Sequence, residues 1–187
     1  MPPQPEITNP IVPDIRSAVY CGAIRDGNRA EWEFAFNMYK DPEVGLDTQN
    51  LIPALACSRN VWQLRSYLQM AIDEVHIRRQ DVWTVFSSVA NNPNGQQLAW
   101  DFFVENWPTI EERFGEMSFK LSSIIHSITH SLSTEKQLKE LETFAENTKD
   151  GSIARNALTR AAGAIRTNIA WRHKNEANVI EWLQQHA

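Results

Sequence analysis

The apolar residues of this chain recur every three to four positions along most of its length, which is the spacing of one face of an α-helix. The stripes are clearest at residues 32–39, 82–89 and 121–132, where large aromatic and aliphatic side chains mark one side. No sustained alternation of apolar and polar residues, which would mark a half-buried strand, interrupts them. The pattern therefore predicts an all-α protein.

Turn-like segments rich in glycine, proline, asparagine and aspartate separate the stripes. These segments are residues 25–28, 40–47, 91–95, 106–109, 113–116 and 149–151. They divide the chain into about nine or ten helices of one to four turns, and such short connections make neighbouring helices antiparallel.

Helix starts are marked by two candidate capping boxes, in which a threonine is followed three residues later by glutamate or glutamine. The first pairs Thr109 with Glu112, and the second pairs Thr134 with Gln137. After Gly151 we expect one or two long helices, with residues 171–175 as the break if there are two.

Successive helix pairs without strands are typical of a curved α-solenoid. We predict a HEAT/armadillo-like superhelix of antiparallel helix pairs, with a compact helical bundle as the alternative. Residues 1–13 are polar and rich in proline, so we interpret them as a linker or a cut end. Residues 14–187 then form a single helical domain.

Length and charge exclude some classes of protein. With 187 residues, the chain is long enough to bury a core without a metal or disulfide. Its formal net charge of −5 and pI of about 5.5 exclude a basic surface for nucleic acid. No run approaches the ~20 apolar residues of a membrane span. Cys21 and Cys57 are either two buried thiols or a disulfide, and their spacing does not decide between them.

The main candidate for chemistry is the histidine pair His126 and His130, because residues four apart share a helix face. Zinc peptidases use this spacing in H-E-x-x-H, where the glutamate is the general base. Here Ser127 replaces that glutamate and no third ligand is evident, so we predict no metal site. The chain also lacks a nucleophile elbow, a phosphate-binding loop and a dinucleotide fingerprint, so we assign no catalytic residue.

Seven tryptophans are many for this length, and most of them lie on the apolar stripes. We interpret them as packing anchors of the core, because a large aromatic side chain gains most from burial.

Several stretches taken together resemble one family. In order, they are "IRSAVYCGAI", "EWEFAFNMY", "LIPALACSRNVWQLRSYL", "IRRQD", "NNPNGQQLAWDFFVENW", "STEKQLKELETF" and "NIAWRHKNEANVIEWL". They are similar to the C-terminal helical domain of zinc aminopeptidases of the aminopeptidase N type, a domain also found in ER and insulin-regulated aminopeptidases. The resemblance extends from about Asn9 to Leu183.

The resemblance implies a non-catalytic domain of a parent enzyme that removes N-terminal residues from peptides. The family's G-A-M-E-N and H-E-x-x-H motifs belong to an upstream catalytic domain and do not occur here. We therefore expect zinc in that domain of the parent and no cofactor in this chain. The resemblance also pairs Cys21 with Cys57 in a disulfide, as in extracellular members, and implies the ectodomain of a membrane-anchored or secreted parent.

The resemblance further implies partners. In the family this domain closes the substrate cavity, so we expect contact with the catalytic domain of the same parent chain, contact with peptide substrates, and in some members a homodimer. The candidate peptide-facing residues are Arg78, Arg79, Gln80, Arg166, Asn168 and Arg172. The alternative is a stand-alone helical interaction module from a catalytically inactive relative.

Overall fold

The computed structural model describes residues 9–41, 47–116 and 118–186. Over these residues it contains ten α-helices, one short 3-10 helix and no strand, which confirms the all-α prediction. In chain order the elements are η1 (Pro13–Ile15), α1 (Arg16–Asp26), α2 (Arg29–Lys40), α3 (Thr48–Leu55), α4 (Val61–Ile72), α5 (Val82–Asn91), α6 (Gln96–Glu105), α7 (Trp107–Phe114), α8 (Ser118–Thr129), α9 (Glu135–Asn147) and α10 (Ile153–His186).

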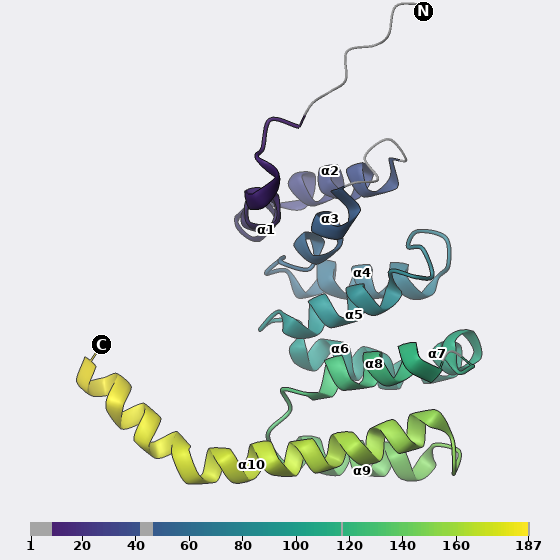
Figure 1. Cartoon of the computed structure of the whole chain (residues 1–187), viewed down its shortest axis with the longest axis vertical. Helices are drawn as coiled ribbons and strands as arrows, with labels where there is room; N and C mark the ends of the chain where they lie inside the picture. The colour runs from purple at the N-terminus through teal and green to yellow at the C-terminus, as the bar shows by residue number, and fades with distance from the viewer. Residues whose placement is uncertain (1–8, 42–46, 117, 187) are drawn as a thin grey trace, which may run out of the picture.

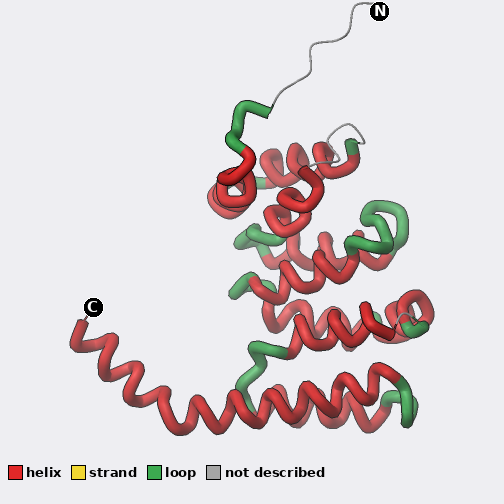
Figure 2. Tube along the Cα trace, in the orientation of Figure 1, coloured by secondary structure: helices red, strands yellow, loops and turns green. Residues whose placement is uncertain are grey.

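The helices stack as a column of two layers (Figure 1). Helices α1, α3, α5, α8 and α10 form one layer, in which each packs against the next. Helices α2, α4, α6 and α9 lie behind them and pack across the layers, for example α2 on α3 and α9 on α10. Figure 2 shows the connecting loops gathered at two opposite edges of the column. This is a superhelical arrangement of antiparallel helices, and its assignment to the HEAT/armadillo type stays a prediction.

Of the two capping predictions, one is confirmed and the other is wrong. Thr134 caps α9, accepting a hydrogen bond from the backbone N–H of Gln137, and the two residues form the expected capping box. Thr109 caps nothing, because α7 already begins at Trp107. Pro108 lies in the first turn of α7, where its missing N–H needs no partner and its fixed φ suits a helix.

After Gly151 the chain forms one helix, α10, which is the first of the two expected alternatives and continues through residues 171–175. Gly151 itself has φ of +70°, a left-handed conformation that favours glycine, and it ends the turn between α9 and α10. In Figure 1, α10 leaves the side of the column and bends where it does so. Although α10 has 34 residues, no helix among those described is long and apolar enough to cross a membrane.

The expectation that the tryptophans mostly anchor the core is wrong for four of the seven. Trp32 and Trp100 are buried and Trp107 is partly buried, but the other four are at least 42% exposed. These four are Trp62, Trp83, Trp171 and Trp182. A position on an apolar stripe is buried only where a neighbouring helix covers it, and the sequence does not show which helix that is.

A disulfide joins Cys21 of α1 to Cys57, which follows α3, and confirms the pairing that the resemblance implies. The same turn after α3 is held from α5, where the Asn92 side chain donates hydrogen bonds to the carbonyls of Ala56 and Ser58 at 2.7 and 2.8 Å. The covalent bond therefore closes a loop of 36 residues. It joins two segments that the packing of α1 on α3 already brings together.

Replacing both Cys21 and Cys57 with serine should lower the free energy of unfolding by about 3–4 kcal/mol, because the unfolded chain regains the entropy that the cross-link removes. Urea denaturation of the oxidised wild type and the double variant measures the difference. The reduced wild type is the control and should match the variant. A loss below about 1 kcal/mol would show that the cross-link does not stabilise the fold by reducing the entropy of the unfolded chain.

Candidate functional site

Three of the predicted peptide-facing residues lie in the loop between α4 and α5. The Arg78 guanidinium donates to the Asp81 carboxylate at 2.7 Å and lies over the ring of Tyr39. Arg79 donates to the carbonyl of Arg113 and lies over the ring of Phe114. Gln80 is exposed. Both arginines therefore tie this loop to neighbouring helices.

The other three lie on α10. Arg166 forms an ion pair with Glu142 of α9. The Asn168 side chain donates to the carbonyls of His130 and Leu132 at 2.9 Å, which holds the α8–α9 loop against α10. Arg172 adds a contact with Ser133 at 3.3 Å and an ion pair with Glu176 at 2.6 Å.

The two groups do not come together. The loop between α4 and α5 lies at one edge of the column, and the middle of α10 lies near the opposite edge at the end of the stack (Figure 1). The six residues therefore form no single site, and their contact with a peptide stays a prediction.

His126 lies on α8 and His130 directly follows its last residue. Both are exposed, and their ring centroids are 6.0 Å apart. The Nδ1 atom of His130 lies 2.8 Å from the carbonyl oxygen of Ser127. Among the residues that the structure describes, no group of three histidine, cysteine or carboxylate side chains is placed to hold a metal ion. The pair thus offers two ligands where protein zinc sites use three or four, and it does not fit a zinc centre.

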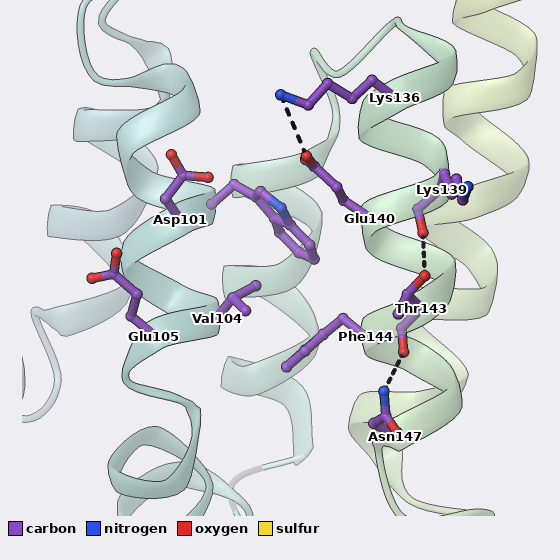
Figure 3. Close-up of a pocket in the computed structure, with 10 residues that line it drawn as sticks. Asp101, Val104, Glu105, Lys136, Lys139, Glu140, Thr143, Phe144 and Asn147 are labelled. Atoms are coloured by element: carbon purple, nitrogen blue, oxygen red, sulfur yellow. Dashed lines mark hydrogen bonds and ion pairs between the residues drawn. The ribbon is translucent and has the colours of Figure 1, made fainter.

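A groove that the sequence did not predict runs between α6 and α9 (Figure 3). It has a volume of about 700 Å³ and an apolar floor formed by Trp100, Val104 and Phe144. The rings of Trp100 and Phe144 meet edge to face, with centroids 5.8 Å apart. Trp100 was expected in the core and is buried, whereas Val104 and Phe144 are half-buried. Because α6 and α9 do not close on one another, part of this apolar surface faces the groove.

Charged side chains of both signs form the walls of this groove. On α6, Asp101 accepts a hydrogen bond from Gln97, and Glu105 pairs with Arg65 of α4. On α9, Lys136 lies 3.7 Å from Glu140. One end is bridged by a hydrogen bond of 2.9 Å between Gln137 and Gln97. An apolar floor between walls of mixed charge suits an extended peptide, whose side chains and backbone need both kinds of contact.

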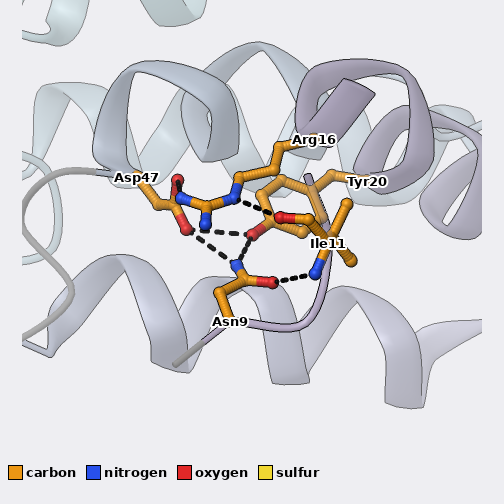
Figure 4. Close-up of polar contacts among 5 residues, drawn as sticks. All are labelled: Asn9, Ile11, Arg16, Tyr20 and Asp47. Carbon is orange, nitrogen blue, oxygen red and sulfur yellow. Dashed lines mark hydrogen bonds and ion pairs between the residues drawn. The ribbon is translucent and has the colours of Figure 1, made fainter. Parts of the chain in front are cut away.

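A second unpredicted feature is a polar cluster that joins the segment before α1, α1 itself and the start of α3 (Figure 4). Asp47, only 5% exposed, precedes α3 and is 2.9 Å from the Arg16 guanidinium and 3.0 Å from the Tyr20 hydroxyl. Asn9 donates to the same carboxylate at 2.9 Å, and Arg16 donates to the carbonyl of Ile11. The cluster therefore fastens the segment before α1 to α1 and to the start of α3.

The cluster determines the ionisation of its two acidic groups. Burial disfavours the charged form of Asp47, but hydrogen bonds from Arg16, Tyr20 and Asn9 outweigh it and lower the pKa of the carboxyl. Burial also raises the pKa of the Tyr20 phenol, and the neighbouring carboxylate adds to that rise. At neutral pH the cluster is an ionised aspartate held by neutral donors and one arginine.

Comparison with known proteins matches residues 3–167 to the family model described as the ERAP1-like C-terminal domain. Aminopeptidase N of Bos taurus is 40% identical over 182 residues, which cover 96% of this chain and 19% of that protein. Aminopeptidase Ey of Gallus gallus is 40% identical over 94% of this chain and 18% of its own length. The thyrotropin-releasing hormone-degrading ectoenzyme of Homo sapiens is 31% identical over 94% of this chain and 16% of its own length. The chain thus spans less than a fifth of the length of these relatives.

Asp47→Asn should reduce the free energy of unfolding by about 1.5–3 kcal/mol near neutral pH, the range for hydrogen bonds to a charged group. The folded pKa of Asp47 is lowered, so its contribution is present above the ordinary carboxyl pKa and is lost as the pH falls through the lowered pKa. The difference between wild type and variant should therefore shrink toward acid pH. Urea unfolding at a series of pH values measures it.

The matched control is Asp101→Asn, the same substitution at an exposed carboxylate with one side-chain hydrogen bond. It should change stability by less than about 0.5 kcal/mol, as surface substitutions usually do. If the Asp47→Asn deficit were equal at neutral and acid pH, the cluster would act through packing rather than through the charge of Asp47.

Proposed function

Because the chain belongs to the family of ERAP1-like C-terminal domains, we propose that it is the non-catalytic C-terminal domain of a longer zinc aminopeptidase. The observation that carries this proposal is the combination of coverage and length. Relatives named aminopeptidase N match 94–96% of this chain with only 18–19% of their own length. The residues that perform the reaction lie in the larger part of the parent, since the sequence contains no H-E-x-x-H motif.

In the parent, the domain closes the substrate cavity and contacts the part of a bound peptide that lies away from the cleaved bond. A stacked helical column supports this role because it presents a long surface from one continuous scaffold. The groove between α6 and α9 is the feature best suited to a peptide, because Trp100, Val104 and Phe144 offer an apolar floor. The six polar residues singled out in the sequence are secondary candidates.

The disulfide supports a location outside the cytosol. Such bonds persist in extracellular and secretory compartments and are rare where thiols are kept reduced. We therefore propose that the parent is an ectoenzyme or a secreted enzyme. Homodimerisation through this domain also belongs to the proposal.

An antibody raised against this chain tests the proposal in the source tissue. We expect it to detect a polypeptide far larger than 21.4 kDa and to deplete aminopeptidase activity from a detergent extract. The purified 187-residue chain should neither bind stoichiometric zinc nor hydrolyse an aminoacyl-coumarin. A band only at the size of the chain would contradict the proposal and favour the stand-alone interaction module.

The peptide groove has its own test. Val104→Lys places a charge on the apolar floor, at a half-buried position that lets a long side chain reach water, so the fold should persist. We expect it to weaken binding of a fluorescent peptide of about ten residues roughly tenfold, or about 1.4 kcal/mol, measured by anisotropy on the isolated chain. The control, Val61→Lys, makes the same change at a 47% exposed valine at the start of α4. Equal affinities for the two variants would exclude this groove.

A further inference from the structure

The last four turns of α10 carry a stripe of large apolar side chains that nothing in the described chain covers. Fifteen large hydrophobic residues are exposed, and five of them lie within residues 171–183. The five are Trp171, Val179, Ile180, Trp182 and Leu183, each at least 44% exposed. Of the other ten, Ile153 begins α10 and nine are spread over six other elements and their loops. Elsewhere in the described chain, no 13-residue stretch holds more than three.

Val179, Ile180 and Leu183 continue the buried face of the same helix, and Trp171 and Trp182 lie together on the side next to it. Ile165 and Ile169 pack into the core against the preceding helices, and beyond Ile169 no described residue is buried. Steps of three or four residues lead from Ile169 through Arg172 and Glu176 to Ile180 and Leu183, so they share its side of the helix. The stripe therefore has the form of a packing face that extends beyond its packing partners.

The projecting part also lacks the support that a helix needs. Residues 170–186 extend away from the column in Figure 1. A free segment of this length is marginal as a helix in water, because most helical stability in proteins comes from packing an apolar face. A groove of about 550 Å³ lies between this segment and the α8–α9 loop, and its lining includes His130, Ser133, Trp171 and Ile180.

The charges on the stripe indicate an apolar partner. Arg172 and Glu176, the two charged residues on this face, already form an ion pair at 2.6 Å. They present no net charge, so the partner surface needs no opposite charge. The charged residues Lys174 and Glu181 lie on the other side of the helix.

The area of these five side chains favours a partner surface in the same polypeptide over a second copy of this chain. Burying all five side chains from their present exposure would remove about 500 Å² of surface, since large aromatics bury about 150–250 Å² each when fully covered. A standard complex between free proteins buries about 800 Å² per partner. A surface within the same polypeptide binds at a high effective concentration and needs less area.

We propose that this stripe, the α10 stripe (Trp171, Val179, Ile180, Trp182 and Leu183), is the docking surface for an apolar face of the remaining part of the same polypeptide, outside residues 1–187. The inference rests on the proposed function, which places this chain in a protein about five times longer. It goes further by naming the residues through which this domain is held to the rest.

Hydroxyl-radical footprinting with mass spectrometry tests the stripe on two samples, the isolated chain and the longer polypeptide purified from the source with the antibody. Trp171 and Trp182 should be oxidised readily in the isolated chain and several-fold more slowly in the longer polypeptide. Trp62, 82% exposed at the start of α4, is the internal control and should be oxidised at the same rate in both.

The outcomes separate this inference from the proposed function. If the source contains only the 21.4 kDa chain, the proposed function fails and the inference fails with it. A longer polypeptide in which Trp171 and Trp182 are oxidised as in the isolated chain overturns the inference alone. Light scattering of the isolated chain identifies the remaining rival, since a dimer with both tryptophans protected would assign the stripe to a second copy and overturn the inference.

Trp182→Asp in the longer polypeptide gives a second measurement. It lies beyond the last buried residue, so the helical column should fold normally. We expect residues 170–186 to become sensitive to limited proteolysis, because a charge replaces one of the two tryptophans of the stripe. Trp62→Asp is the matched control and should leave the same segment resistant. Resistance in both variants would overturn the inference.

Discussion

The structure depends on the burial of one apolar face of each helix against its neighbours in the column. Helices α1 to α9 have 8–13 residues, a length at which an isolated helix is unstable in water. Each contributes side chains to a continuous core, with Tyr67, Phe103 and Ile125 fully buried at successive levels. A helix in such a stack is stabilised mainly by the helices it contacts, so stability is a sum of neighbouring interfaces.

This dependence explains what the sequence could and could not predict. Helix positions and the capping of α9 by Thr134 follow from local patterns, which the sequence contains directly. The disulfide followed from resemblance, because the spacing of Cys21 and Cys57 left two interpretations. The Asp47 cluster could not be predicted, since its partners lie 27 to 38 residues away and only tertiary packing brings them together. The exposure of Trp171 and Trp182 was missed for the same reason.

The two ends of the column differ in the side chains that they carry. At the first end, Asp47 is surrounded by Arg16, Tyr20 and Asn9, and the polar groups satisfy one another. At the last end, α10 continues past the column with its apolar face uncovered. Repeat-like stacks require polar outer faces where they meet water. The polar cluster at the first end meets this requirement, although Val12, Ile15 and Val19 beside it are also exposed. The uncovered face of α10 does not meet it.

The ion pairs of this domain also bear on the proposed contact with a peptide. Arg78, Arg166 and Arg172 are each already bound to a carboxylate, and Arg79 to a backbone carbonyl. Binding a peptide carboxylate would exchange one such partner for another and leave the electrostatic free energy nearly unchanged, because exposed pairs contribute only about 0–1 kcal/mol. Affinity must then come from apolar surface removed from water. The floor formed by Trp100, Val104 and Phe144 offers such surface, so peptide contact in this domain should depend more on apolar side chains than on the charge of a distant carboxylate.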